Sequence, residues 1–187
     1  MGPKGSEIWN SMLDSAEEIL RERGYGALTS RLVAENIGVK QRLVYYYFQT
    51  MDELIVETFR RLAIREIERI DHALASEHSL RKIWDVCIHT TDTRLISEFM
   101  ALANRIEPLR QEVRGYIEQS RDRLVTALTR ALNAVGAQPP LPPVAIVIFA
   151  TNAALQLPRE AQIGISNGHA EVIALIEGLL ATWDPED

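Results

Sequence analysis

The sequence predicts an all-α protein of about nine helices, with an N-terminal three-helix head and a larger helical body. Three observations predict this class. Apolar residues recur at helical spacing, with little alternation, along the 187 residues. Runs of β-branched residues are short, and prolines gather in few places, above all between residues 139 and 143. Nearly half of the chain, 47%, is hydrophobic, which is enough to bury a sizeable core.

Three helices are expected in residues 1–50. The first covers 6–23, where apolar side chains form a stripe at helical intervals and a glycine follows as a stop signal. A short helix over 30–37 begins after a threonine, which is a favoured N-cap residue. A second short helix over 40–48 follows a glycine that permits a tight turn. Two short helices joined in this way form a helix-turn-helix unit.

Six further helices are expected in residues 51–187, which we assign to a separate body. Thr50 and Glu53 form a capping-box pattern at the start of the first of them. Glycine and proline mark the later boundaries, and a stiff proline-rich connector precedes the last two helices. The expected helices cover 50–75, 80–91, 93–105, 108–135, 144–157 and 169–183.

The net charge of -6 is unevenly distributed along the chain. Residues 1–50 hold six basic and six acidic side chains, so the acidic excess lies entirely in the body. Within the head, Arg31, Lys40 and Arg42 cluster after the first helix, with only Glu35 among them. Because basic groups neutralise phosphates, this cluster is the candidate nucleic-acid surface.

The most informative stretch extends from Thr29 to Leu54 and reads TSRLVAENIGVKQRLVYYYFQTMDEL. It closely resembles the signature of the TetR family. The shared features are a threonine that starts the first short helix, a Val-Ala pair, Gly-Val at the turn, an aromatic cluster ending in Phe, and an acidic-Leu start to the next helix. Two positions depart from this pattern: Met51 stands where many relatives have Lys, and Tyr47 where His is frequent. Met51 therefore lacks the cation that would contact a phosphate there.

The residue types of the second short helix suit contacts to bases and phosphates. Gln41 pairs well with adenine and Arg42 with guanine, and Leu43 suits a thymine methyl group. Tyrosine hydroxyls and the Lys40 ammonium are expected on phosphates, together with the amides that start the first short helix. The resemblance implies that Arg31 also reaches a base. The alternative is that the tyrosines are core and the basic residues face solvent, although three successive tyrosines cannot all point inward. The expected DNA-binding residues are Thr29, Ser30, Arg31, Lys40, Gln41, Arg42, Leu43, Tyr45, Tyr46 and Tyr47.

The resemblance implies that the body binds a small molecule, and that binding changes the separation of two heads through the helix over 50–75. The candidate lining residues are large, or polar within apolar surroundings, and each can equally be plain core. Their mixture favours an apolar or amphipathic compound, whereas Arg105 or Arg159 would allow a charged one. The candidates are Trp84, Ile88, Phe99, Met100, Tyr116, Phe149 and Asn152.

The last two predicted helices carry more apolar surface than one chain readily covers. The helix over 144–157 is apolar nearly all round, and the helix over 169–183 has large residues on one face and small ones on another. Small residues permit the close approach of a neighbouring helix, so we expect a homodimer, with a well-packed monomer as the alternative. The small residues are Ala170, Ala174, Gly178 and Ala181.

Asp85, His89 and Asp92 fall on one helical face at a spacing that metal ligands also use. No second histidine or cysteine cluster accompanies them, so we prefer a hydrogen-bond network and expect no metal or other cofactor. The single Cys87 has mostly apolar neighbours and is expected to be a buried thiol in a reducing cytoplasm. No leader opens the chain and no apolar stretch is long enough for a membrane span, so we expect no membrane insertion.

Together these features predict a ligand-responsive transcriptional regulator. An enzyme is less favoured, because the sequence has no nucleophile elbow, phosphate-binding glycine loop or nucleotide fingerprint. We expect a homodimer whose two reading helices enter successive major grooves of a pseudo-palindromic operator in double-stranded DNA, about 34 to 36 Å apart. Family habit favours a repressor that a small-molecule effector releases. The other alternative is a ligand- or partner-binding protein of the same fold without specific DNA binding.

Overall fold

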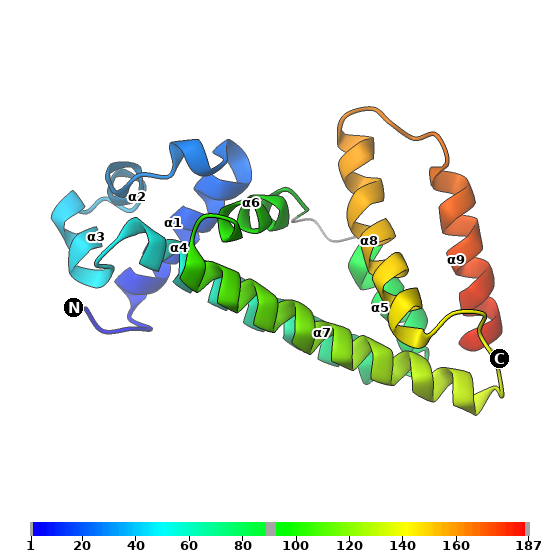
Figure 1. Ribbon diagram of the computed structural model, residues 1–187. Helices are drawn as coiled ribbons and strands as arrows, with labels where there is room; N and C mark the ends of the chain where they lie inside the picture. The colour runs from blue at the N-terminus through cyan, green and yellow to red at the C-terminus, as the bar shows by residue number, and fades with distance from the viewer. Residues whose placement is uncertain (1, 89–92, 186–187) are drawn as a thin grey trace. The chain divides into compact units, whose positions relative to one another are not determined.

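The computed structural model describes residues 2–88 and 93–185 (Figure 1). Its regular structure is helical, and within these residues there are nine α-helices, one 3-10 turn and no strand, in agreement with the predicted class. The elements are α1 (Glu7–Arg23), η1 (Tyr25–Ala27), α2 (Ser30–Asn36), α3 (Gln41–Tyr47), α4 (Met51–Leu74), α5 (Ser79–Ile88), α6 (Thr93–Ala103), α7 (Glu107–Ala134), α8 (Pro143–Gln162) and α9 (His169–Trp183).

The chain forms two compact units, and helices α4 and α7 each contribute residues to both. The head unit comprises residues 1–64 and 94–115, and the body unit comprises 65–93 and 116–187. The head unit is larger than the expected reading domain of residues 1–50, because α6 and the N-terminal parts of α4 and α7 pack with α1–α3. A functional boundary at residue 50 stays a prediction.

The head unit is built around the buried faces of α1, α3 and α4. Met12 and Leu20 of α1 are fully buried, and so, almost completely, are Val44 of α3 and Phe48 directly after it. The indole of Trp9 stacks on the Phe48 ring, with centroids 6.0 Å apart. This packing fixes the faces that α2 and α3 turn to solvent.

Helix ends follow the capping signals in α1 and differ most from expectation in α8. The Ser6 hydroxyl accepts a hydrogen bond from the Trp9 amide (3.3 Å), and α1 ends directly before Gly24, whose φ of 73° favours glycine. The sequence predicts that the eighth helix ends at Leu157, whereas α8 continues through Pro158. Proline lacks one amide donor, but the buried Leu157 beside it keeps this turn packed.

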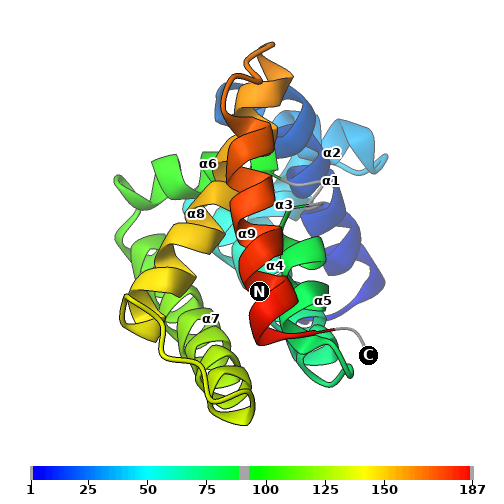
Figure 2. The ribbon, with the colours of Figure 1, turned by 90° about the vertical axis from the view of Figure 1, so that its right-hand side faces the viewer.

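The body unit has its own core, formed by side chains of α4, α5, α7, α8 and α9. Helices α8 and α9 lie side by side in both views (Figure 2) and contact each other. The C-terminal end of α9 is joined to the start of α5, since the Arg81 amide and guanidinium both donate to Asp184, each over 3.0 Å. Among the described helices, none has the length and hydropathy that a membrane crossing requires.

Candidate nucleic-acid interface and internal cavity

The α2–turn–α3 unit is held by local capping and by a shared core. The Thr29 hydroxyl accepts a hydrogen bond from the Leu32 amide (3.1 Å) and so caps α2. Gly38 has a φ of 70°, which allows the tight turn, and the Val39 amide then donates to the Ala34 carbonyl (2.9 Å). Thr29 and Gly38 therefore act as the helix cap and the turn glycine that the sequence predicts.

The outer face of α3 presents polar and aromatic side chains to solvent. Lys40, Gln41 and Arg42 are exposed at its start, and Tyr45 and Tyr46 are half exposed further along. The five side chains supply cationic, amide and phenol donors, the types that read base edges and hold phosphates. The Leu43 side chain is only partly exposed, at the edge of this face.

Two of these side chains are tied to α2 by Ser30, which is itself buried. The Ser30 hydroxyl accepts from the Gln41 side-chain amide (2.8 Å) and donates to the Tyr45 hydroxyl (3.1 Å). The Ser30 side chain therefore holds Gln41 and Tyr45 from the α2 side and is itself not exposed on the outer face of α3.

Arg31 extends from α2 and is held by an acidic neighbour. Its guanidinium pairs with the Glu35 carboxylate over 2.7 Å, and the Glu35 hydrogen bond and charge raise the Arg31 pKa. Both side chains are largely exposed, so this pair is easily exchanged for a contact to a phosphate or a base.

The expectation that Tyr47 contacts a phosphate does not fit the structure, because the residue is only 7% exposed. Tyr47 lies three positions after Val44, so both side chains point to the inner face of α3. Its hydroxyl receives a hydrogen bond from the Ser6 hydroxyl (3.5 Å), and the Tyr46 ring packs edge-on against it. The helical spacing from Val44 was the signal that places this tyrosine in the core.

The N-terminal residues fold back onto the end of α3, which sequence reasoning did not foresee. The Gly2 amide donates to the Tyr46 carbonyl (2.9 Å), and a Cβ at Gly2 would lie 2.3 Å from the Tyr47 ring. Lys4 forms an ion pair with the buried carboxylate of Glu57 on α4 (2.6 Å). No local signal indicates these contacts, because they join residues more than forty positions apart.

The start of α4 carries the predicted capping box. The Thr50 hydroxyl accepts from the Glu53 amide (3.1 Å), and the Glu53 carboxylate accepts from the Gln49 amide (2.7 Å). Met51, in the first turn, is partly buried and offers no donor to a phosphate.

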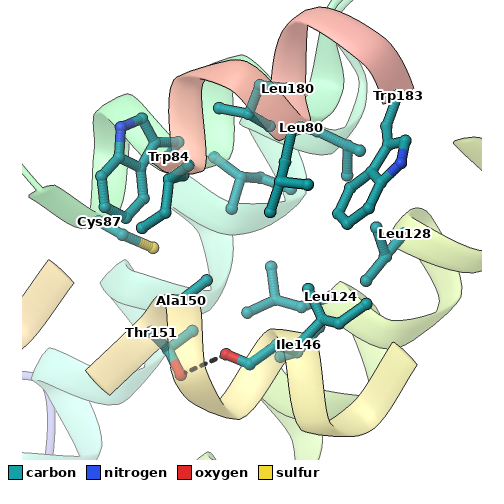
Figure 3. A pocket seen from close by; sticks show the side chains of 14 residues that line it. Leu80, Trp84, Cys87, Leu124, Leu128, Ile146, Ala150, Thr151, Leu180 and Trp183 are labelled. Atoms are coloured by element: carbon teal, nitrogen blue, oxygen red, sulfur yellow. Dashed lines mark hydrogen bonds between the residues drawn. The ribbon is translucent and has the colours of Figure 1, made fainter. Parts of the chain in front are cut away.

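A second feature is a cavity in the body unit, which we call the body cavity (Figure 3). Its volume is about 100 Å³, and side chains of α5, α7, α8 and α9 line it. The lining is apolar almost throughout; Trp84 and Cys87 contribute from α5 and Trp183 from α9. Burial raises the pKa of the Cys87 thiol to about 11, with the charge of Glu66 as a smaller cause.

Of the seven expected ligand-contacting residues, Trp84 is a lining residue of the body cavity. Phe99 lies instead in the head core, where its ring packs against Phe59 with centroids 5.2 Å apart. Met100 is 44% exposed on α6 and Phe149 is 65% exposed on α8. The remaining three have other places: Ile88 and Tyr116 are partly buried in the body unit, and Asn152 is exposed.

Sequence reasoning missed most of the lining because it selected large aromatic and polar residues. The cavity wall consists mainly of aliphatic side chains such as Leu124, Ile146 and Leu180. Aliphatic residues at helical spacing look the same in the sequence whether they enclose a cavity or a filled core.

The expected small-residue stripe of α9 faces outward in the single chain. Ala170, Ala174, Gly178 and Ala181 are all exposed, and Leu175 between them is 64% exposed. The exposed Phe149 lies on the neighbouring helix α8. Together these side chains give the two helices an apolar surface that this chain leaves uncovered.

The suggested metal-ligand spacing falls mostly outside the residues that the structure describes. Asp85 is exposed on α5, whereas His89 and Asp92 lie outside the described residues. Across 2–88 and 93–185, no cluster of three histidine, cysteine or carboxylate side chains is arranged to hold a metal ion.

Residues 12–58 match the sequence model of the family described as bacterial regulatory proteins, tetR family. This part of the chain therefore has the sequence features of the N-terminal domain of that family. This match covers most of α1, then α2, the turn, α3 and the start of α4, and it supports a DNA-binding role for this part of the chain. Among curated proteins, none matches the chain by sequence.

Solved structures of TetR-like regulators share the fold over nearly the whole chain. A candidate transcriptional regulator from Saccharomonospora viridis, in complex with choline, has a TM-score of 0.78 at 12% identity, over 92% of this chain and 94% of that one. A TetR transcription regulator from Haloarcula marismortui gives 0.73 at 18%, over 92% and 95%. The ketosteroid transcriptional regulator KstR2 of Mycobacterium tuberculosis gives 0.67 at 18%, over 96% and 95%.

Proposed function

We propose that the chain is a regulator of the TetR kind, a homodimeric repressor that a small apolar or amphipathic molecule releases from its operator. The observation that carries the DNA-binding part is the outer face of α3, where Lys40, Gln41 and Arg42 are exposed together with Tyr45. The buried faces of α2 and α3 hold this surface in place, so the side chains are presented on a rigid support. The match of residues 12–58 to that family favours a regulator over an enzyme, and we place its action in the cytoplasm, with the DNA.

In this proposal each protomer inserts α3 into a major groove. Gln41 and Arg42 read base edges, with Leu43 beside them, while Lys40, Tyr45 and Tyr46 contact phosphates. Arg31 exchanges Glu35 for a base or a phosphate, and the amides at Thr29 and Ser30 add backbone contacts. Two-fold symmetry requires a pseudo-palindromic site with half-sites about 34 to 36 Å apart.

Selection of bound duplexes from random DNA tests this assignment. We expect an enriched palindrome whose binding falls with salt, since phosphate contacts release counterions. Arg42→Ala should relax the preference at one base position, with a loss of about 1 to 3 kcal/mol. Arg23→Ala, which removes an exposed arginine of α1, serves as the matched control. Failure to enrich any sequence would leave a ligand-binding or partner-binding protein of the same fold.

The dimer part of the proposal rests on the uncovered surface of α8 and α9. A Cβ at Gly178 would have no atom within 4 Å outside the adjoining turns of its own helix, and the same is true of Gly115 on α7. Gly178→Leu should therefore disrupt the dimer by blocking close approach of a partner helix, whereas Gly115→Leu should leave it intact. Light scattering after size-exclusion chromatography distinguishes the two results. Equal dimer content in both variants would rule out this interface.

A further inference from the structure

The body cavity has a wall without charged side chains. Apart from Cys87 and Thr151, its lining consists of leucine, isoleucine, valine, alanine and two tryptophans. Glu66 and Arg69, whose charges act on the Cys87 thiol, are paired with each other over 2.9 Å. A charged ligand would therefore enter this space without a counter-ion, at a high cost in lost hydration.

The polar atoms of the wall have little to offer a ligand. The Thr151 hydroxyl donates to the Val147 carbonyl in its own helix (2.8 Å), a bond drawn in Figure 3. The Cys87 thiol stays protonated at neutral pH, since burial raises its pKa to about 11, and a thiol is a weak donor. The indole nitrogens of Trp84 and Trp183 lie on the sides of their rings turned away from the open centre (Figure 3).

The size of the cavity restricts the ligand as much as its polarity does. The volume of about 100 Å³ is somewhat below that of engineered apolar cavities, about 150 Å³, that stay dry and bind benzene. One aromatic ring or a branched hydrocarbon group of similar size fits it. A compound as large as a steroid exceeds this volume.

We propose that the body cavity selects small, uncharged, hydrocarbon-like compounds of about the size of one benzene ring and excludes compounds with a permanent charge. This inference rests on the proposed function, in which the body holds the effector, and it names the effector's chemical class. It also separates this chain from the Saccharomonospora protein, whose complex contains the cation choline. The two indole rings are the only lining groups that attract a cation, so choline is the most demanding negative probe.

The test is calorimetric titration of the full chain with three probes of similar size: toluene, choline, and dimethylbutanol as the uncharged isostere of choline. We expect saturable binding of toluene and dimethylbutanol, and choline weaker by about tenfold or more. Choline binding as tightly as its uncharged isostere would overturn the proposal, and so would the absence of toluene binding.

Substitutions in the cavity lining, with one control outside it, locate the binding. Ala150→Phe adds roughly the volume of the cavity at a lining position and should abolish toluene binding, whereas Ala101→Phe, at an exposed position in the head unit, should not. If Ala150→Phe fails to fold, Ala150→Leu gives a smaller obstruction. Thr151→Val should leave toluene binding unchanged, because its hydroxyl already donates to Val147. A loss of about tenfold in Thr151→Val would show that the ligand needs this hydroxyl, against the proposal.

Operator binding, measured on the selected duplex, separates this inference from the proposed function. Toluene that binds the chain but leaves DNA affinity unchanged would contradict the effector role and support the cavity's chemical class. Release of the operator by choline, with no effect of toluene, would support the effector role and refute the chemical class.

Discussion

The backbone amide of Tyr25 donates a hydrogen bond to the Glu98 carboxylate, 3.1 Å away, and so joins the turn after α1 to helix α6. The same carboxylate lies against Gly24, where a Cβ would come within 3.1 Å of it. Gly24 has a positive φ, so both the conformation and the space at this turn favour glycine. Both residues belong to the head unit, so this hydrogen bond holds α6 against the turn that follows α1.

Glu98→Ala should loosen this turn. Loss of the acceptor should cost about 0.5 to 1.5 kcal/mol of unfolding free energy and speed hydrogen exchange at the Tyr25 amide. Glu98→Gln keeps an acceptor oxygen and should preserve most of the protection. Nuclear magnetic resonance exchange rates check both variants, and equal rates in the two would mean that the hydrogen bond is not formed in solution.

Helix α4 is fixed to α1 by a buried carboxylate. Glu17 is 6% exposed and accepts from Arg61 of α4 (3.1 Å) and from Arg21 (2.8 Å). Arg61→Ala should lower stability by about 2 to 4 kcal/mol, because it leaves a buried charge with one partner fewer. Arg31→Ala, which breaks a pair with Glu35 whose side chains are both largely exposed, should cost at most about 1 kcal/mol. Urea unfolding measures both, and similar losses would refute the special role of Glu17.

Local signals predicted the helices well, because caps and apolar spacing are written in neighbouring residues. Thr29, Gly38 and the capping box at Thr50 all work as their positions suggest. The body cavity and the contact between Tyr25 and Glu98 were not predictable in this way. They depend on which helices come together, and a single sequence gives no distance between segments far apart in the chain. Phe99 illustrates this: its size suggested a ligand contact, yet α6 carries it into the head core.

Alanine at the two neighbouring tyrosines of α3 should affect different quantities: stability at Tyr47 and operator affinity at Tyr46. Tyr47→Ala removes a buried ring and should destabilise the head by about 3 to 5 kcal/mol. Tyr46→Ala removes a ring that is 53% exposed and should change stability by about 0.5 kcal/mol or less while weakening operator binding. Urea unfolding and fluorescence anisotropy with labelled operator measure the two quantities. A stable Tyr47→Ala variant with weakened DNA binding would instead place Tyr47 at the interface.

The Cys87 thiol should be inert at neutral pH and should make stability depend on alkaline pH. With its pKa raised from 9.0 to about 11 by burial, alkylation by iodoacetamide at pH 8 should be about a hundredfold slower in the folded than in the unfolded chain. The thiol of the unfolded chain ionises at lower pH than the buried thiol of the folded chain. The contribution of Cys87 to the stability of the folded state is therefore complete below pH 9 and is lost as the pH rises to 11.

Urea unfolding from pH 8 to 11 measures this loss as a fall of the unfolding free energy with pH. Cys87→Ala should make that fall less steep. Burial likewise raises the pKa of Tyr116 from 10.0 to about 12, so Tyr116→Phe separates its contribution above pH 10. An unchanged slope in both variants would assign the alkaline loss to other groups.

The backbone at Gly2 should be needed for the reading helix to keep its position. A Cβ there would lie 2.3 Å from the Tyr47 ring, so Gly2→Val must displace either the N-terminal residues or the end of α3. Displacement would also break the amide bond from Gly2 to the Tyr46 carbonyl, leaving an α3 carbonyl without its donor. We expect operator affinity to fall by about threefold to tenfold, with a loss of stability of about 1 kcal/mol. Gly26→Val, at an exposed glycine with no atom within 4 Å of its Cβ position, is the matched control. Anisotropy titrations of the two variants decide the matter, because equal operator affinities would mean that the N-terminal residues do not support α3 in solution.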